Sequence, residues 1–366
     1  MEKIAFICGG ASVEREISCL TGLKIVKELE KEKIPFLLIY LDEKNNFYLV
    51  KELSPTFVKN QKMEKGSFIK KNQESFFKTK FKKYLFDKVL ILGHGKNIED
   101  GALSAYFNQI NIPCLGESIY QGVAIQDKDI FKMILKANKI KTLDSYSLFK
   151  YQLDNYPLIE QIAKKVKYPL IVKPSKLGSS IGINKVEENK ELAKALFEAF
   201  LYDDTVIVEP FIKNKKEFNI AVFGYENQVE FSSLEEVNHN DQVLSFYDKY
   251  DYSKSNQKRI INPEISLEMK EEMKDIAKRV FQRLNLCGIV RFDFIYDVDT
   301  NQLYLNEANL IPGSLAYYLF EDKYSIKELI AHYIEVLEAK RKEEKLLSTN
   351  YKEGFINRID LSKIKK

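Results

Sequence analysis

The chain has 366 residues, of which 45% are hydrophobic and 30% are charged. These proportions are ordinary for a globular protein, and the length allows two or three domains with cores of their own. The net charge of +4 is small, and lysines and glutamates are interspersed, which argues against a surface dedicated to nucleic acid. The sequence has no hydrophobic segment long enough to span a bilayer and no signal-peptide pattern at its N-terminus. We therefore expect a cytoplasmic enzyme or binding protein that has neither a nucleic-acid nor a membrane partner.

The four cysteines and three histidines limit which disulfides and metal sites the chain can form. The cysteines stand singly among apolar neighbours, so we expect buried thiols rather than disulfides. Three histidines are too few for a His-rich zinc site, which is therefore excluded.

Strand and helix patterns alternate in the first third of the chain. Apolar strands are expected at 3–8, 35–41 and 88–92, and a helix at 16–31. This order is typical of a parallel α/β sheet, whose ligands collect at the carboxyl ends of the strands.

The rest of the chain predicts two further groups of strands. In the first group, strands are expected at 168–173, 181–186 and 206–210, with helices at 127–139 and 158–166. In the second, strands at 217–224 and 228–237 are followed by a hairpin, and helices with one apolar stripe are expected at 268–284 and 326–337. From Glu338 onward the sequence is polar and basic, which predicts a partly disordered end.

The hairpin carries a cluster of polar residues around the turn at 297–301. Strand periodicity places Arg291 and Asp293 on one face of the first strand, and Glu307 and Asn309 on one face of the second. A turn near position 300 sets Asp293 opposite Glu307. Two carboxylates and an amide oxygen make a site suited to Mg²⁺. The same residues also fit a salt-bridge cluster on a solvated sheet face.

A second segment joins a strand that ends at Lys173 to the loop Gly-Ser-Ser-Ile-Gly at 178–182. Backbone N–H groups of such a loop can hold a polyphosphate, with Lys173 supplying a positive charge. The plainer alternative is a tight hairpin beside a solvated lysine.

Five motifs together resemble the D-alanine–D-alanine ligase family of ATP-grasp enzymes. In chain order they are Gly-Gly-Ala-Ser-Val-Glu-Arg-Glu-Ile-Ser at 9–18, His-Gly-x-x-x-Glu-Asp-Gly at 94–101, Lys-Pro with Gly-Ser-Ser-x-Gly at 173–182, Arg-x-Asp at 291–293, and Glu-x-Asn with Pro-Gly at 307–313. The resemblance extends over residues 3–337.

The resemblance implies an α/β and α+β protein, in which an N-terminal parallel α/β domain precedes a two-part ATP-grasp fold. The implied parts are the N-terminal domain at 1–120, a central ATP-grasp subdomain at 121–205, a C-terminal subdomain with the metal site at 206–340, and a polar tail at 341–366.

The family resemblance also implies an activity, which is the ATP-dependent joining of two D-alanines for peptidoglycan synthesis and thus for cell-wall biogenesis and cell shape. It implies ATP as a substrate, two Mg²⁺ ions (or Mn²⁺) as cofactors, and a homodimer. Two alternatives remain, namely a ligase that takes D-lactate or D-serine second, and a catalytically inactive ATP-binding regulator. Intact charged residues argue against the regulator, because buried unpaired charges are costly to keep.

The motifs assign residues to ATP and its metal ions by resemblance. The nucleotide would contact Lys128, Lys173, Ser179, Ser180, Glu209 and Glu217. The metal ligands would be Asp293, Glu307 and Asn309.

The first D-alanine would be held near the N-terminus. By resemblance Glu14, in a network with Ser179 and a tyrosine, holds its ammonium group, and His94 faces its carboxylate. From the sequence alone, Glu14 also fits a first-turn acid that complements a helix dipole. Arg291 and the backbone of Gly313 resemble the groups that stabilise the oxyanion.

The sequence departs from the family pattern in three places. Ile98 stands where the family has a glycine. The segment 237–259 is the expected lid, but its Lys249-Tyr250 pair is closer than usual to the preceding Phe-Tyr-Asp, so Tyr252 competes with Tyr250 as the network tyrosine.

The third departure follows Gly313, where Tyr318 replaces the serine that would bind the second substrate's carboxylate. Lys249 can supply charge to that carboxylate, and Ser314 or Tyr318 can supply a hydroxyl.

Overall fold

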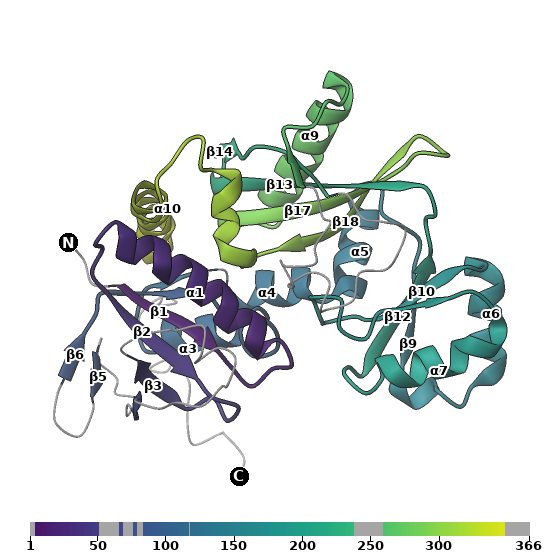
Figure 1. Ribbon diagram of the computed structural model, residues 1–366, viewed down its shortest axis with the longest axis horizontal. Coiled ribbons are helices and arrows are strands. Elements are labelled where there is room, and N and C mark those ends of the chain that lie inside the picture. Colours follow the sequence, from purple (N-terminus) through teal and green to yellow (C-terminus); the bar gives the residue numbers. More distant parts are fainter. Residues whose placement is uncertain are drawn as a thin grey trace, which may run out of the picture.

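The computed structural model describes residues 4–50, 66–68, 76–78, 83–116, 118–237 and 259–347. The predicted lid residues Lys249, Tyr250 and Tyr252 lie outside these ranges. Figure 1 shows an N-terminal unit at the lower left, a central unit at the lower right, and a C-terminal unit above and between them.

The N-terminal sheet has the strand order β4-β3-β2-β1-β7-β8. Its parallel strands are β1 (Ile4–Gly9), β2 (Phe36–Leu41), β7 (Lys88–Ile91) and β8 (Cys114–Leu115). At one edge β3 (Phe47–Val50) and β4 (Gly66–Phe68) add antiparallel pairs. A separate hairpin consists of β5 (Phe76–Lys78) and β6 (Lys83–Leu85), and the helices are α1 (Arg15–Lys31) and α3 (Ala102–Gln109). All of β1 is buried, as expected for a strand covered on both faces.

The central unit is a four-stranded antiparallel sheet of order β11-β10-β12-β9. Its strands are β9 (Tyr146–Phe149), β10 (Leu170–Pro174), β11 (Asn184–Val186) and β12 (Thr205–Pro210). A 3₁₀ turn, η1 (Lys150–Gln152), follows β9, and the helices α6 (Tyr156–Val166) and α7 (Asn189–Ala199) pack against the sheet (Figure 1).

The C-terminal sheet has the order β16-β15-β13-β17-β18, and β14 pairs with β13. Its strands are β13 (Lys215–Tyr225), β14 (Gln228–Phe231), β15 (Glu235–Val237), β16 (Arg259–Ile261), β17 (Cys287–Asp297) and β18 (Gln302–Asn309). The helices around it are α4 (Ile119–Gln126), α5 (Lys128–Ala137), α9 (Leu267–Arg283), η2 (Gly313–Leu319) and α10 (Ile326–Leu346).

The two faces of this sheet are covered differently. Residues at even positions of β13 and β17, such as Phe218 and Phe292, enter a core shared with α5 and α9. Odd positions such as Phe223 and Ile289 enter a second core, which includes residues of β1, α1 and α10. This second core joins the N-terminal unit to the C-terminal sheet, and the same sheet face becomes polar beyond it, at Arg291.

These elements confirm the predicted fold class, with corrections at four places. The strand expected at 228–237 is two strands, β14 and β15, and the strand expected at 181–186 begins only at Asn184. The N-terminal sheet is mixed rather than wholly parallel, because β3 and β4 extend it by antiparallel pairing. Helix α10 continues through Leu346, past the point where a polar tail was expected. Residues 338–346 are mostly Glu, Lys, Arg and Ala, which favour helix even without an apolar stripe.

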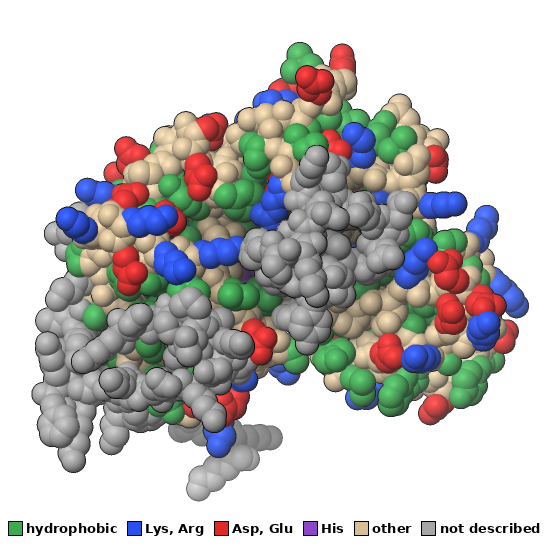
Figure 2. Space-filling model, in the orientation of Figure 1, with side chains coloured by type: hydrophobic (Ala, Val, Ile, Leu, Met, Phe, Trp, Pro, Cys, Tyr) green, Lys and Arg blue, Asp and Glu red, His purple; other side chains and the backbone are tan. Residues whose placement is uncertain are grey.

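The charge distribution on the surface and the state of the cysteines agree with the expectations from the sequence. On the face in Figure 2, acidic and basic side chains lie side by side over the helices α6 and α7. The four cysteines are buried free thiols, as predicted. No helix within the described ranges has the length and apolar character needed to cross a membrane.

Candidate active site

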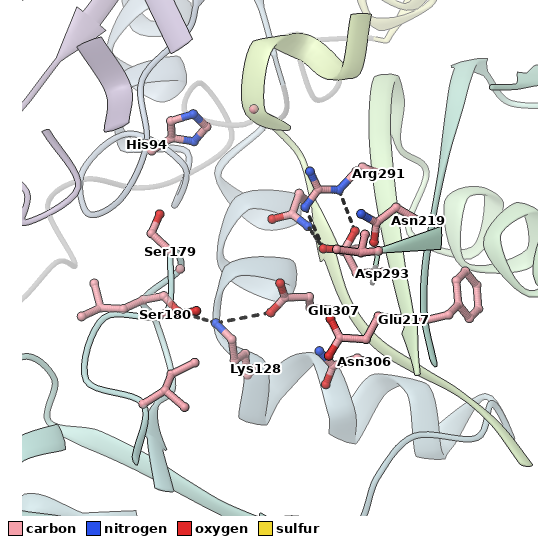
Figure 3. Close-up of a pocket in the computed structure, with 18 of the residues that line it drawn as sticks. His94, Lys128, Ser179, Ser180, Glu217, Asn219, Arg291, Asp293, Asn306 and Glu307 are labelled. Carbon is pink, nitrogen blue, oxygen red and sulfur yellow. Dashed lines mark hydrogen bonds and ion pairs between the residues drawn. The ribbon is translucent and has the colours of Figure 1, made fainter. Parts of the chain in front are cut away.

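A cavity of about 390 Å³ lies where the three units meet. Figure 3 shows its polar side chains, with Ser179 and His94 on one side, Arg291 and Asp293 on the other, and Lys128 below. Most of the predicted site residues that the structure describes line this cavity, namely Glu14, His94, Lys128, Lys173, Ser179, Ser180, Glu217, Arg291, Asp293, Glu307, Asn309, Gly313, Ser314 and Tyr318. Residues far apart in the sequence therefore share one site.

The hairpin pairs as the strand periodicity predicts. Asp293 lies opposite Glu307, and Arg291 lies opposite Asn309, with a bulge after Asp293. The Arg291 guanidinium donates from Nε and Nη2 to the two oxygens of Asp293 at 2.7 Å each, and Asn309 Nδ2 donates to Asp293 Oδ2 at 3.1 Å. Burial would lower the pKa of Arg291, but Asp293 outweighs this and holds it above its usual value. The ion-pair cluster expected from the sequence thus coexists with the oxygen-rich arrangement.

The donor set of this hairpin fits Mg²⁺. No group of three or more His, Cys, Asp or Glu side chains suited to a metal ion occurs among the described residues. Asp293, Glu307 and the Asn309 amide oxygen nevertheless bring three oxygen donors to adjoining strands. Mg²⁺ commonly rests on one or two carboxylates and takes its remaining ligands from phosphates and water.

Lys128 and Lys173 bring positive charge to the opposite wall. Lys128 begins α5, donates from Nζ to the Leu177 carbonyl at 2.6 Å, and has its Nζ 3.9 Å from Glu307 Oε2. Lys173, near the end of β10, is only 6% exposed and pairs with Glu209. Both lysines line the cavity.

Glu209 lies behind these lysines rather than among the residues that line the cavity. Its second oxygen is 3.0 Å from Lys132 Nζ, so two buried lysines share one buried carboxylate. Burial would raise the pKa of Glu209, but Lys132 and Lys173 outweigh it and lower the pKa to about 2. Burial in turn lowers the pKa of Lys132, although Glu209 opposes that change. The sequence analysis missed Lys132. Its position four residues after Lys128, on the same helix face as Phe131, could have indicated that it is buried near the site.

The loop after β10 holds the carboxylate of Glu14. Ser179 Oγ donates to Glu14 Oε1 at 2.8 Å, and the backbone N–H of Gly178 donates to Oε2 at 3.4 Å. A Cβ on Gly178 would lie 2.9 Å from Glu14, which explains the glycine. Burial, followed by the charge of Glu99, raises the pKa of Glu14 even though His94 and Ser179 lower it. The predicted Glu14–Ser179 contact is present.

His94 lies beside Glu14 with both ring nitrogens engaged. Nδ1 is 3.0 Å from Glu99 Oε1, and Nε2 is 2.9 Å from Thr21 Oγ1. Burial would lower the pKa of His94, but Glu99 and Glu14 outweigh it and raise the pKa. A direct hydrogen bond from His94 to a substrate carboxylate would require Nε2 to release Thr21.

Ile98, the first departure from the family pattern, is a core residue. Its side chain is 2% exposed and packs in the N-terminal core. A Cβ on Gly10 would lie 2.3 Å from Ile98 Cδ1, and a Cβ on Gly93 would lie 2.9 Å from Cγ2. Ile98 thus packs against two glycines of the strand-end loops.

The turn after Gly313 has an unusual backbone. Ser314, Leu315 and Ala316 all have φ between 49° and 55°, which is costly for residues other than glycine. Leu315 and Ala316 are buried in the core shared with α1 and α10, which holds this turn in place. A Cβ on Gly313 would meet no atom within 4 Å, so its backbone borders open space.

Tyr318 and Glu217 complete the predicted set. The Tyr318 hydroxyl donates to Glu235 Oε2 at 2.9 Å, so its single proton is already engaged. Burial, with Glu235, raises the pKa of Tyr318 despite the two nearby arginines. Glu217 lines the cavity at the start of β13 and pairs with Lys215. The sequence analysis missed Glu235 and Asn219. Asn219 could have been predicted, because it lies two residues after Glu217 and alternate residues of a strand share a face.

The comparisons with known proteins cover the whole of this site. Residues 3–117 match the family model described as D-ala D-ala ligase N-terminus, and residues 134–334 match the one described as D-ala D-ala ligase C-terminus. The chain is 34% identical over 365 residues to a D-alanine–D-alanine ligase of Campylobacter jejuni, covering 98% of each chain. It is 32% identical over 358 residues to a D-alanine–D-alanine ligase of Thermosipho melanesiensis, covering 95% of this chain and 97% of the relative.

A solved structure agrees with these sequence matches. The crystal structure of the D-alanine–D-alanine ligase from Helicobacter pylori aligns with a TM-score of 0.75 at 28% identity, covering 92% of this chain and 98% of that one. The chain belongs to the D-alanine–D-alanine ligase family.

Proposed function

We propose that this protein uses ATP to join two D-alanines into D-alanyl-D-alanine, the reaction that supplies a peptidoglycan precursor. One observation carries the proposal. Glu14 with its partner Ser179, and the oxygen-rich cluster of Asp293, Glu307 and Asn309, line the same cavity. In Figure 3, Ser179 lies across the cavity from Asp293 and Arg291. This arrangement supports adjoining sites for an amino acid and a metal-bound polyphosphate.

The first half of the reaction forms an acyl phosphate. Glu14, with Ser179, holds the ammonium of the first D-alanine and orients its carboxylate toward the γ-phosphate. That carboxylate attacks the γ-phosphorus, and ADP leaves with the electron pair of the broken P–O bond. Lys128 and Lys173 stabilise the charge on the phosphates, and two Mg²⁺ ions (or Mn²⁺) on Asp293, Glu307 and Asn309 would neutralise it further.

The second half forms the peptide bond. The ammonium of the second D-alanine loses a proton, and the resulting neutral amine attacks the acyl carbon. The nitrogen then loses a second proton, and inorganic phosphate leaves with the electron pair of the broken C–O bond. Arg291 and the Gly313 N–H border the position where the oxyanion develops. One such donor typically contributes about 3–4 kcal/mol to catalysis. Water must be kept out, because it would hydrolyse the acyl phosphate, and we assign this role to the lid at 237–259.

Product analysis tests the proposal. Purified protein with ATP, Mg²⁺ and D-alanine should release phosphate and form the dipeptide, detected by mass spectrometry. Adding D-lactate or D-serine distinguishes a ligase with another second substrate, and the absence of phosphate release with every substrate would indicate an inactive regulator. We further expect the protein to be a cytoplasmic homodimer. Analytical sedimentation of the purified protein would test whether it is a dimer.

A further inference from the structure

Glu235 is a buried carboxylate in the cavity to which the mechanism assigns no role. Its side chain is 1% exposed and lines the cavity from β15. Strand pairing places Glu235 opposite Asn219, Asn219 opposite Asp293, and Asp293 opposite Glu307. Directly opposed residues share a sheet face, so Glu235 lies on the face of the metal ligands. Two strand spacings place it roughly 10 Å from Asp293.

One oxygen of Glu235 is well satisfied and the other is not. Oε2 accepts hydrogen bonds from Tyr318 Oη and from Asn219 Nδ2, both at 2.9 Å. Oε1 is buried and accepts no hydrogen bond from the residues that the structure describes, although Arg259 Nε lies 3.5 Å away. Oε1 thus has one long ion-pair contact and no hydrogen bond, which is costly for a buried carboxylate oxygen, so a further donor is to be expected here.

The surroundings of Glu235 match the charges of an amino acid. Arg259 lines the same cavity, its side chain is 44% exposed, and its guanidinium carbon lies 5.3 Å from the centre of the Tyr318 ring. An amino-acid zwitterion presents an ammonium group next to a carboxylate. Glu235 and Arg259 present the complementary carboxylate and guanidinium, close to Arg291 and to the turn after Gly313.

We propose that Glu235 binds the ammonium group of the second amino acid and thereby selects an amine over a hydroxy acid as the acceptor. The inference rests on the proposed function, because it concerns the second substrate of that reaction. An ammonium group donates a charge-assisted hydrogen bond to Oε1, and the half-exposed Arg259, which now pairs with that oxygen at 3.5 Å, can turn to the carboxylate. D-Lactate lacks the positive charge, and a site built for a charged donor strongly rejects an analogue without it.

The test uses Glu235→Gln, which keeps the shape and removes the charge, and Glu236→Gln as its matched control. Glu236 is the next residue of β15 and is also buried, but it points to the opposite face, pairs with Lys216 at 3.1 Å, and is absent from the cavity lining. For each protein, the KM of the second D-alanine is measured, together with the ratio of dipeptide to depsipeptide made from equal D-alanine and D-lactate.

Glu235→Gln should raise the KM of the second D-alanine about ten- to a hundredfold and shift the product ratio toward depsipeptide by at least about tenfold. The KM values of ATP and of the first D-alanine should stay unchanged, and Glu236→Gln should behave as wild type. Glu235→Asp, which restores the charge on a shorter side chain, should recover most of the preference for the amine.

A folded Glu235→Gln protein with wild-type second-site KM and product ratio would overturn the proposal, and so would equal effects of the two glutamine variants. If Glu235→Gln does not fold, the product ratio of the wild-type protein provides the test. Depsipeptide formed as readily as dipeptide overturns the assignment, whereas a preference for dipeptide above about tenfold supports it. A wild-type protein that forms no dipeptide contradicts the proposed function instead.

Discussion

Lys128 Nζ lies 3.9 Å from Glu307 Oε2, although Lys128 is the first residue of α5 and Glu307 lies in β18. This pair brings a cation and an anion to the place where a polyphosphate and its metal would meet. Lys128 is also held by the Leu177 carbonyl, so the pair links the C-terminal sheet to the loop after β10.

Glu307→Gln should nearly abolish turnover while leaving the fold intact, because Mg²⁺ prefers anionic oxygens. Turnover is measured by phosphate release, and metal–nucleotide binding by the rise in Tm on adding Mg²⁺ and ATP, which should shrink. Glu272→Gln, on the exposed face of α9, serves as the control. Retention of more than about a tenth of the activity, worth only ~1.4 kcal/mol, would place the metal site elsewhere.

Lys173→Ala should raise the KM of ATP and lower kcat, because the lysine charge meets phosphates in both the ground and the transition state. Lys132→Met is the informative partner, since Lys132 shares Glu209 but is absent from the cavity lining. It should destabilise the fold by about 3–5 kcal/mol, measured by urea unfolding, with a smaller effect on the KM of ATP. Unchanged ATP kinetics in Lys173→Ala would leave that lysine a structural role alone.

Tyr318→Phe should raise the KM of the second D-alanine about ten- to a hundredfold, with little change for the first D-alanine or ATP. The hydroxyl donates to Glu235, so its loss disturbs the carboxylate in that part of the cavity. Ser314→Ala is measured beside it. If Ser314→Ala carries the whole effect, the Tyr318 hydroxyl has no part in binding this substrate. If neither variant changes this KM, the second-substrate pocket does not follow Gly313.

The stability of the protein in acid should depend on Glu209. Its pKa is about 2 in the folded protein against 4.5 for an unperturbed glutamate. A lowered folded pKa stabilises the fold above about pH 4.5, and that contribution is lost as pH falls toward 2. At neutral pH it amounts to about 3 kcal/mol. Urea unfolding of wild type and Glu209→Gln between pH 7 and pH 3 should show a stability difference that narrows as pH falls, and a constant difference would contradict the assignment.

The sequence by itself determined the local geometry. Period-two alternation placed Asp293 and Glu307 on one face of the hairpin. The turn pairs Asp297 with Gln302, and a bulge after Asp293, which the alternation did not predict, brings Asp293 opposite Glu307. Apolar stripes likewise located α9 and the start of α10, because one helix face must be buried. The extension of α10 to Leu346 was also encoded locally, in helix propensity, but the polar composition concealed it.

Only the tertiary structure decided which distant residues meet. Glu235 reaches the sheet face of Asp293 through the pairing of β15 with β13 and of β13 with β17, a long-range register that no local pattern specifies. Glu209 likewise becomes the shared partner of Lys132 and Lys173 only when α5 packs near β10 and β12. Local periodicity tells which face a side chain takes, whereas the charge that it meets there depends on how separate elements pack.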